Sequence, residues 1–480
     1  MKEQTIRGSF WTLIDAAGGQ VLSLLAFLVL ARLLVPQDYG VVALATSILA
    51  IPGVLLNEGL ADALIQRDDL QDGHINAAFW ANLGLAGVFV VLAQITAGWI
   101  AEATGEPLVG PAVRWLSLSL IATALTSIVG AIDRRKFHYS TFALRTLIAT
   151  ASAAIVGVGM AFFGYGVWSL IVSQIVQAVT GAWVMWIGLT WRPRFEFSFA
   201  AFRTLYKFAS HVMAGNALRF ATDRIDQIII GSFLGVLALG YYYMAQRLLT
   251  TINFMTISLV DNVMLPALSR MQDDRNKLVE TYISMIWAAA ILWVPTVAGL
   301  GLISSHLVPL LFGHKWDAAV PVILIASVTA ASQALVRPTS QVLLAVGKPA
   351  VNVLLNLIQL AITVVSFIVG VRYGVAGAAW AYTFTSFATI PFHLVALHRV
   401  VDVPVGSLLR RYSSVLAAGM IMSVVVFVVG ELLSPSMGDW CFLVQIASGA
   451  AAYAIALYAF APSKVKELVL TVSNALHLTA

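Results

Sequence analysis

Long apolar stretches separated by short polar breaks dominate the pattern of this sequence. A helix that crosses the hydrocarbon core of a membrane needs about 20 mostly apolar residues. A window of that length predicts fourteen spans, at approximately 10–34, 40–60, 77–101, 111–132, 142–163, 166–190, 206–233, 237–265, 279–303, 318–345, 350–372, 375–398, 412–433 and 440–461. Because the breaks are short, the pattern predicts an all-α integral membrane protein in which no extramembrane domain interrupts the spans.

The composition supports this class. Hydrophobic residues make up 60% of the chain and charged residues only 11%, whereas a soluble chain carries about a quarter charged residues. This deficit argues against a cytosolic enzyme, a nucleic-acid binder and a secreted domain. The single cysteine, Cys441, excludes intramolecular disulfides and Cys-rich metal sites, and the span order predicts that it lies near the outer surface.

The placement of lysine and arginine predicts the orientation. With the N-terminus in the cytoplasm, the predicted inner segments hold nineteen of the 28 basic residues, and the outer loops hold two, Lys315 and Arg372. Cytoplasmic loops carry the excess of basic residues in membrane proteins. The sequence therefore predicts an even number of spans and two cytoplasmic termini. The net charge of +5 is then explained by the anionic inner leaflet, so no nucleic-acid partner is expected.

Two short motifs recur along the chain. Leu34 precedes Gly40 by six residues, and Leu234 precedes Gly240 by the same distance, at an offset of 200. Tyr165-Gly166-Val167 recurs as Tyr373-Gly374-Val375, at an offset of 208. Two matches in the same order indicate internal duplication, which is common in transporters. They predict two six-helix lobes related by a pseudo-two-fold axis along the membrane normal.

The lobes are expected at residues 1–190 and 206–400. Between them, residues 191–208 alternate phenylalanines at 195, 197 and 199 before a run of basic and apolar residues, which predicts an interfacial cytoplasmic linker. Residues 401–480 hold the last two helices and a cytoplasmic C-terminus.

Polar residues inside the predicted spans are the candidate functional residues, because charged side chains there are costly and by default face a cavity or a partner. Asn216, Arg219, Asp223 and Gln227 step by three, four and four residues and so share one helix face. The complete set expected to line a hydrated cavity between the lobes is Arg219, Asp223, Arg224, Arg247, Asn216, Gln227, Asn253, Arg337, Gln333, Asp15 and Gln20.

Several polar residues of the predicted spans also have a structural interpretation. Arg219 and Asp223 are four residues apart and could neutralise each other while merely joining helices. Asp226 is either a packing acid or the candidate for ion coupling. Glu58 and Asp62, at the end of the second span, are expected to anchor the chain near the cytoplasmic side.

The basic run Arg134, Arg135 and Lys136 has two interpretations as well. It could contact a lipid phosphate, or it could be an orientation signal. His314 in the outer segment 313–316 has no second histidine at metal spacing, and no metal site is expected.

Several strings resemble the polysaccharide transporter (Wzx-type) family of the multidrug/oligosaccharidyl-lipid/polysaccharide superfamily. They are ARLLVPQDYG at 31–40, GLADALIQR at 59–67, RRKF at 134–137, GYGVWSL at 164–170, DQIIIGSFLGVLALGYYYMAQRL at 226–248, LPALSRMQDD at 265–274 and LFGHKWDAAVP at 311–321. The resemblance spans residues 1 to about 400. It implies a flippase that moves undecaprenyl-pyrophosphate-linked oligosaccharide repeat units across the bacterial inner membrane for exopolysaccharide, capsule or lipopolysaccharide biosynthesis. Polysaccharide polymerase and export proteins are the implied candidate partners.

The sequence contains no motif for a catalytic nucleophile, a phosphate-binding loop or a catalytic zinc. We therefore expect a transporter rather than an enzyme, with no cofactor and with H⁺ or Na⁺ as candidate coupling ions. The alternatives are a peptidoglycan lipid-precursor flippase and an ion-coupled multidrug exporter of the same superfamily. A membrane glycan polymerase or glycosyltransferase fits less well, because the longest outer loop offers only Asp317 as an acid.

Overall fold

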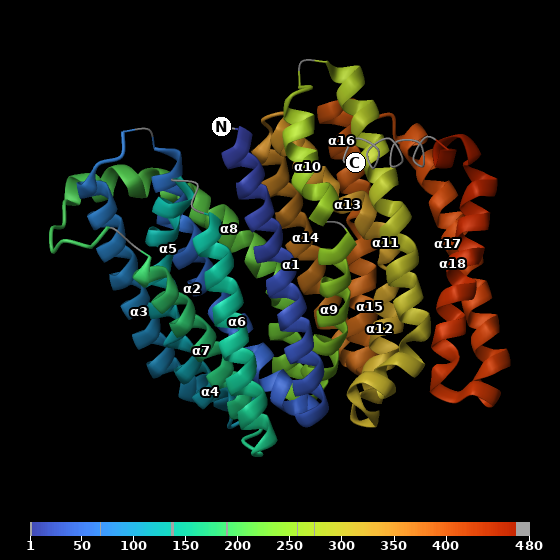
Figure 1. Ribbon diagram of the computed structural model, residues 1–480, viewed down its shortest axis with the longest axis horizontal. Coiled ribbons are helices and arrows are strands. Elements are labelled where there is room, and N and C mark those ends of the chain that lie inside the picture. The colour runs from blue at the N-terminus through green and yellow to red at the C-terminus, as the bar shows by residue number, and fades with distance from the viewer. Residues whose placement is uncertain are drawn as a thin grey trace. The chain divides into compact units, whose positions relative to one another are not determined.

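The computed structural model describes residues 2–67, 69–135, 139–188, 191–256, 258–272 and 274–466. Within these ranges the side chains of residues 2–16, 66, 139–141, 208, 211–212, 254–256, 258–263, 434–437 and 439 are not described. The described chain is helical with short connections (Figure 1). It divides into two compact units, Met1–Tyr243 and Met244–Ala480.

The described part of the first unit contains eight complete helices and the start of a ninth. They are α1 (Lys2–Leu33), α2 (Pro36–Gln66), α3 (Asp72–Thr104), α4 (Val109–Ser117), α5 (Ser119–Arg135), α6 (Tyr139–Phe162), α7 (Val167–Ile187), α8 (Phe199–Phe233) and α9 (Gly235–Thr256). The unit boundary falls inside α9.

Local sequence signals set several helix ends in this unit. Proline at the first position of α2 has a backbone angle that suits a helix start, and the Asp38 carboxylate accepts a hydrogen bond from the Val35 N–H at 3.1 Å. The Ser198 hydroxyl accepts a hydrogen bond from the Ala201 N–H at 3.2 Å and so caps α8. Gly105 ends α3 with a φ of 65°, a conformation that glycine adopts without steric cost.

The second unit continues with α10 (Ser258–Ser269), α11 (Arg275–Phe312), η1 (His314–Ala319), α12 (Val320–Ser327), α13 (Ala330–Ala345), α14 (Pro349–Gly370), η2 (Val371–Tyr373), α15 (Gly374–Ala388), α16 (Ile390–Val401), α17 (Val405–Met437), η3 (Gly438–Trp440) and α18 (Cys441–Phe460). The η1–α12 segment and α13 form one apolar stretch that bends by 60°.

Charged side chains close two helix ends in the second unit. The Asp274 carboxylate accepts a hydrogen bond from the Lys277 N–H at 3.1 Å and caps the start of α11. Arg275 donates to the carbonyls of Val400 and Val401 at the end of α16 and pairs with Asp402 at 3.0 Å. A cation at a helix C-terminus interacts favourably with the helix dipole.

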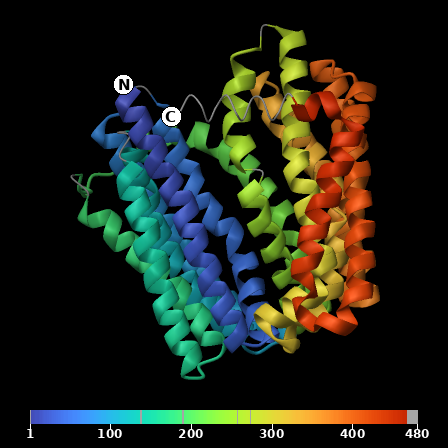
Figure 2. The same ribbon diagram turned by 45° about the vertical axis from the view of Figure 1, so that its right-hand side comes forward.

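Neighbouring helices in each unit pack along most of their length. In the first unit α2 lies against α5 and α8, and α6 lies between α1 and α7. Leu60, Leu64, Phe79, Ile128 and Leu205 form part of one core cluster that joins α2, α3, α5 and α8. In the second unit α17 runs beside α11 and α18, as Figure 2 shows for the α17–α18 pair.

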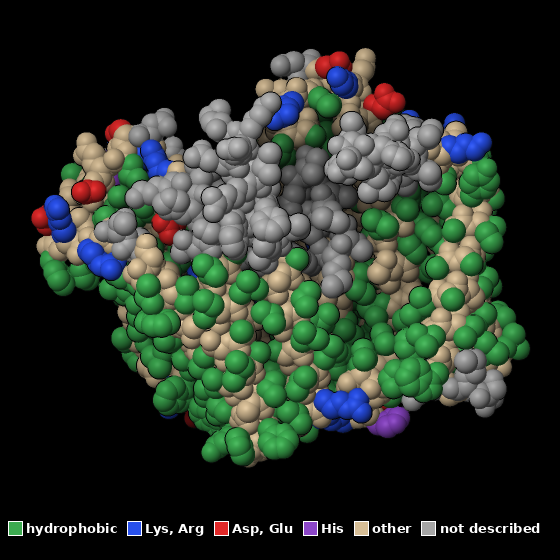
Figure 3. Space-filling view, in the orientation of Figure 1, with side chains coloured by type: hydrophobic (Ala, Val, Ile, Leu, Met, Phe, Trp, Pro, Cys, Tyr) green, Lys and Arg blue, Asp and Glu red, His purple; other side chains and the backbone are tan. Residues whose placement is uncertain are grey.

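Most of the described helices are long and apolar enough to cross a membrane. Among the described residues, nine stretches are long and apolar enough to cross, or ten if the bent pair at His314–Ala345 forms one span. The apolar stretch Pro349–Val401 has 53 residues, and within it α14 and α15 pack against each other as a hairpin. Hydrophobic side chains cover the flanks of the helices, and charged side chains gather at helix ends (Figure 3). The chain is therefore a multi-pass membrane protein.

These nine or ten stretches do not confirm the predicted count of fourteen spans. The described apolar part of α1 is short, at Ala17–Leu33. Within the described residues, α8, α9 and α10 are not both long and apolar enough to be counted as spans. Polar and charged side chains lower the hydropathy of α8 and α9.

The predicted lobes remain a prediction, and the compact units divide the chain elsewhere. The boundary lies at Tyr243 rather than in the predicted linker at 191–208. The reason is that α8 packs against α2 and α3 instead of standing apart from them.

The first repeated motif meets its own copy where α2 crosses α9. A Cβ added to Gly40 would overlap the carbonyl oxygen of Val236, and one added to Gly240 would overlap that of Pro36. Positions 36 and 236, like 40 and 240, differ by the repeat offset of 200. The contact is thus reciprocal, in the way that a two-fold axis makes equivalent residues meet.

Candidate functional site

A polar stripe runs along α2 and α8 in the first unit. It consists of Ser47 and Glu58 on α2 and of Asn216, Arg219, Asp223 and Gln227 on α8. Near its middle, the Arg219 guanidinium lies 3.6 Å from the Glu58 carboxylate. The same guanidinium lies over the Phe220 ring, 4.9 Å from its centre, in the geometry of a cation–π contact. The Arg219 side chain nevertheless stays 51% exposed. An arginine in this setting keeps donors available for a further anionic partner.

An ion pair joins Arg219 to Glu58 of α2, and the pairing of Arg219 with Asp223 considered from the sequence stays a prediction. Asp223 is exposed on the same helix. A pair between two helices cannot be read from spacing within one helix, which is why sequence reasoning missed it. The anchoring role expected for Glu58 and Asp62 stays a prediction.

A buried hydrogen-bonded cluster continues the stripe and joins three helices. The Ser47 hydroxyl of α2 donates to Oε1 of Gln227 at 2.8 Å. On α8 the Asp226 carboxylate accepts from the Gln227 N–H and from the Tyr242 hydroxyl of α9, each at 2.7 Å. Both Asp226 and Gln227 are buried. The cluster fixes α2, α8 and α9 relative to one another.

Sequence reasoning found Asp226 and Gln227 but missed Ser47 and Tyr242. Serine and tyrosine occur in many membrane helices without a special role, so neither gave a signal in the sequence. The ion-coupling role considered for Asp226 stays a prediction.

The other cavity candidates divide between the two units. Besides the residues above, the first unit holds Asn216, Arg224 and Gln20, all half-buried. The side chain of Asp15 lies outside the described residues. The second unit holds half-buried Arg247, buried Asn253, exposed Arg337 and Gln333, whose Nε2 donates to the Tyr382 hydroxyl at 2.7 Å. A cavity that unites the two sets stays a prediction.

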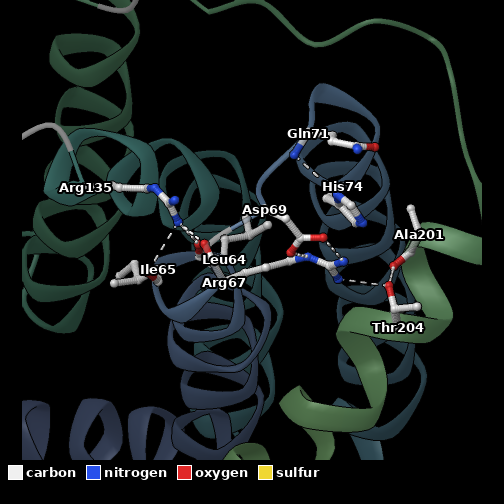
Figure 4. Close-up of polar contacts among 9 residues, drawn as sticks. All are labelled: Leu64, Ile65, Arg67, Asp69, Gln71, His74, Arg135, Ala201 and Thr204. Atoms are coloured by element: carbon white, nitrogen blue, oxygen red, sulfur yellow. Dashed lines mark hydrogen bonds and ion pairs between the residues drawn. The ribbon is translucent and has the colours of Figure 1, made fainter.

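The ends of α2 and α5 hold a second polar group (Figure 4). Arg135 donates to the carbonyl oxygens of Leu64, Ile65 and Arg67 and so closes the end of α2. Arg67 in turn binds both carboxylate oxygens of Asp69, at 2.7 and 3.0 Å, and the Thr204 hydroxyl of α8 at 3.2 Å. Its hydrogen bonds hold the pKa of the Asp69 carboxyl below its usual range.

These contacts bear on the basic run at 134–136. Arg135 has carbonyl partners within the protein, and the Arg134 guanidinium lies 5.8 Å from the centre of the Phe142 ring. Lys136 lies outside the described residues. The two roles expected for this run, an orientation signal or a lipid-phosphate contact, stay predictions. Within the part of the chain that the structure describes, no group of three or more metal-binding side chains occurs.

The predicted linker at 191–208 is hydrogen-bonded to α3 through the backbone of Arg194. Asn76 accepts from the Arg194 N–H at 3.0 Å, and the Trp80 indole N–H donates to the Arg194 carbonyl at 2.8 Å. Phe195 stacks on Trp80 with ring centres 4.8 Å apart, yet it is 92% exposed. The described part of the linker is non-helical up to Ser198 and continues as the first turns of α8.

Proteins named for the biosynthesis of succinoglycan, lipopolysaccharide and teichuronic acid share sequence with this chain. The succinoglycan biosynthesis transport protein ExoT of Rhizobium meliloti is 25% identical over 69% of this chain and 66% of its own length. The lipopolysaccharide biosynthesis protein WzxC of Escherichia coli is 22% identical over 77% and 76%. The teichuronic acid biosynthesis protein TuaB of Bacillus subtilis is 22% identical over 72% of each chain.

Solved structures confirm the fold class. The lipid II flippase MurJ in an inward closed conformation matches 96% of this chain and 100% of its own, with a TM-score of 0.78 and 15% identity. An inward-facing multidrug resistance MATE transporter of the MOP superfamily matches 80% of this chain and 94% of its own, with a TM-score of 0.66 and 14% identity. The all-helical transporter fold predicted from the sequence is therefore confirmed.

The family model described as "Polysaccharide biosynthesis protein" matches residues 29–321, more than half of the chain. That range includes α2, α8 and α9, and with them the Glu58–Arg219 pair and the buried cluster around Asp226. The match confirms the family resemblance drawn from the sequence strings. The chain belongs to the polysaccharide biosynthesis protein family.

Proposed function

We propose that the protein is a flippase for undecaprenyl-pyrophosphate-linked oligosaccharide repeat units in exopolysaccharide, capsule or lipopolysaccharide biosynthesis. Its site of action is the bacterial inner membrane, with both chain termini in the cytoplasm. The observation that carries the proposal is the half-exposed Arg219 of α8, held by Glu58 within a family whose curated relatives are named for polysaccharide biosynthesis.

The chemistry of the substrate explains why such a site is useful. Moving sugar hydroxyls and a pyrophosphate through hydrocarbon would leave many polar groups unsatisfied, at several kcal/mol each. Arginine binds phosphate oxygens with two parallel hydrogen bonds. Asn216, which is half-buried beside Arg219 on α8, would meet sugar hydroxyls, while the polyprenyl tail stays in lipid.

The transport step proceeds by alternating access, in which the lobes expose the site first inward and then outward. The sequence has no nucleotide-binding motif, so the driving force is an ion gradient or consumption of the product outside. Asp226 is the candidate for binding H⁺ or Na⁺. Polysaccharide polymerase and export proteins are the candidate partners that receive the product.

Deletion of the gene tests the proposal directly. We expect polyprenyl-linked repeat units to accumulate facing the cytoplasm and exported glycan to disappear, as measured by lipid extraction and glycan quantification. Complementation with Arg219→Ala or Arg247→Ala should restore little export. Arg203→Ala, which removes an exposed arginine of α8 away from the stripe, is the matched control and should restore export. Normal glycan export after deletion contradicts the proposal.

A second candidate is a flippase for a peptidoglycan lipid precursor. The observation that favours it is the TM-score of 0.78 to the lipid II flippase MurJ. This alternative predicts that deletion of the gene arrests growth and does not specifically abolish export of the glycan. A multidrug exporter of the same fold would instead give inhibitor-sensitive efflux of small cations.

A further inference from the structure

A histidine is buried inside the second unit without hydrogen-bond partners for its ring. His393 lies in α16, within the apolar stretch Pro349–Val401, and it is 8% exposed. Neither of its ring nitrogens has a hydrogen-bond partner among the described residues. An imidazole always carries at least one N–H donor, and a polar group that is buried without a partner is costly. Packing alone therefore does not explain a histidine at this position.

The internal repeat shows which side chain packing alone can place there. At the repeat offset of 208, His393 corresponds to Met185 of α7. Met185 is completely buried and packs with Val129 of α5 in an apolar cluster. Methionine is close to histidine in size and has no N–H group that needs a partner. The first unit thus fills the matching position with an apolar side chain, and the second unit departs from that solution.

The helices around His393 carry few titratable or charged side chains. Helix α16 packs against α13, α14 and α15, all three of which the structure describes in full. Their titratable or charged side chains are Arg337 of α13 and Tyr382 of α15, and α14 has none. Arg337 is exposed, and the Tyr382 hydroxyl accepts a hydrogen bond from Gln333 of α13 at 2.7 Å. These described helices therefore offer His393 no carboxylate.

The end of α16 does not supply a free carboxylate either. On α16 itself, His398 and Arg399 are exposed and lie in its last turn. The next acid along the chain, Asp402, pairs with Arg275 of α11 at 3.0 Å. A buried charge without a counter-charge is far more costly than a buried neutral ring. A protonated His393 is therefore incompatible with the packed contact between α16 and α13.

A helix break precedes His393 by four residues. Helices α15 and α16 are separate and meet at Thr389. The Thr389 hydroxyl donates to the carbonyl oxygens of Thr385 and Ser386, each at 3.1 Å. In the first unit α7 continues unbroken through Gly181, which corresponds to Thr389 at the offset of 208. Residues at the ends of helices absorb the change of direction in hinge motions. The second unit thus combines the histidine with a hinge position that the first unit lacks.

We propose that His393 is a proton-binding site and that uptake of a proton opens the packing of α16 against α13. The neutral ring fits the apolar surroundings, whereas the imidazolium ion requires water, which reaches the ring only when the two helices separate. The ligand is H⁺, and the site lies within the second unit. This inference goes beyond the proposed function, which considers Asp226 of the first unit for ion binding, and it does not depend on the identity of the substrate.

A distance measurement at two pH values tests the proposal. In a Cys441→Ala background, spin labels are attached at Leu344→Cys on α13 and Val395→Cys on α16, two exposed positions. Double electron–electron resonance on the full-length protein in nanodiscs then reports the distance between the labels. A histidine in water takes up a proton at about pH 6.5, so the open arrangement should gain about thirtyfold in population between about pH 8 and about pH 5. We expect a shift toward longer distances at the lower pH.

Two substitutions make the test specific to His393. His393→Met introduces the residue that the first unit buries at the matching position, and it should abolish the shift at low pH. His398→Met makes the same replacement at an exposed position of α16, and it should leave the shift unchanged. Thermal unfolding at about pH 8 checks that both variants fold. We expect His393→Met to be at least as stable as the unmodified protein, because it removes two polar atoms without partners. His393→Leu replaces His393→Met in the test if that variant does not fold.

The outcomes separate this inference from the proposed function. Equal distance distributions at the two pH values, or a shift that persists in a folded His393→Met or His393→Leu variant, overturn the proton site. The flippase proposal then still stands, because consumption of the product outside can drive export. Normal glycan export after gene deletion overturns the proposed function. A shift at low pH that needs His393 would still support the proton site in that case.

Discussion

The environment of Arg219 is suited to holding an anion in place. Glu58 approaches the guanidinium from α2, and Phe220 lies under it. A pair at 3.6 Å with both partners partly exposed contributes little to stability. Its main effect is to restrict where the guanidinium lies.

Double substitution tests this positioning role. We expect Glu58→Ala to reduce glycan export about threefold to tenfold, because roughly 1 kcal/mol of coupling is typical of residues in contact. In an Arg219→Ala background the same change should have little further effect, since the group that Glu58 positions is gone. Export by complemented deletion strains measures both, and Glu58→Gln is the conservative control that should rescue part of the activity. Fully additive losses would contradict a positioning role.

The buried cluster around Asp226 gives a stability prediction. Tyr242→Phe removes the hydroxyl that donates to Asp226 and leaves a buried carboxylate oxygen without that donor. We expect a loss of about 1 kcal/mol, since hydrogen bonds between membrane helices are worth roughly 0.6 to 2 kcal/mol.

The thermal unfolding midpoint of the detergent-purified protein measures this loss. Tyr206→Phe, at an exposed position of α8, is the matched control and should unfold like the unmodified protein. Equal midpoints for Tyr242→Phe and Tyr206→Phe would show that the hydroxyl contributes nothing.

At the level of single residues, the sequence located one face of the site and not the other. The spacing of Arg219, Asp223 and Gln227 on α8 follows from helix geometry alone. Ser47, Glu58 and Tyr242 reach this face from other helices. Their positions depend on how α2, α8 and α9 pack, and one sequence without structure carries no record of that packing.

At the level of helices, the crossing of α2 and α9 depends on two residues without side chains. The added Cβ of an alanine at Gly40 or Gly240 would collide with backbone carbonyls that cannot move aside without shifting a helix. Close approach of this kind at small residues is how membrane helices gain packing contacts.

Gly40→Ala and Gly240→Ala should each lower the thermal unfolding midpoint and reduce export, because each forces α2 and α9 apart. The double variant should be little worse than either one, since a single separation relieves both collisions. Gly87→Ala in α3 is the matched control, because its Cβ meets nothing within 4 Å. It should be neutral or stabilising by up to about 1 kcal/mol. A Gly40→Ala variant with the same thermal unfolding midpoint as the unmodified protein would contradict the prediction.

The hydrophobic pattern predicted where most helices lie, but it did not predict the breaks within some of the spans. The predicted span at 111–132 is two helices, α4 and α5, that meet at Leu118, and the span at 375–398 is broken between α15 and α16. A break of one residue inside an apolar stretch leaves the average hydropathy unchanged. The compact units divide the chain at another place than the predicted lobes, which stay a prediction, because the packing of α8 on α2 does not appear in the pattern.

At the level of the whole molecule, orientation in the membrane can be measured by thiol labelling. The native Cys441 is unsuitable as a probe because the structure buries it completely, although the sequence placed it near the outer surface. In a Cys441→Ala background, Tyr373→Cys and Phe195→Cys place thiols at two exposed positions.

With both termini in the cytoplasm, an impermeant thiol reagent added to intact cells should modify Tyr373→Cys and spare Phe195→Cys. Permeabilised cells are the control, in which both should react. The reverse pattern in intact cells would invert the proposed topology.

Helix α8 has a consequence for how the protein is made. It carries Arg219, Asp223, Arg224 and Asp226 within eight residues, and each such side chain at the centre of an isolated helix costs about 2.5 to 3.5 kcal/mol to place in a bilayer. We expect α8 to leave the insertion machinery only when α2 and α3, synthesised earlier, are already present to receive its polar face. Because α2 and α3 precede α8 in the chain, the helices that pack against its polar face are made before α8 itself.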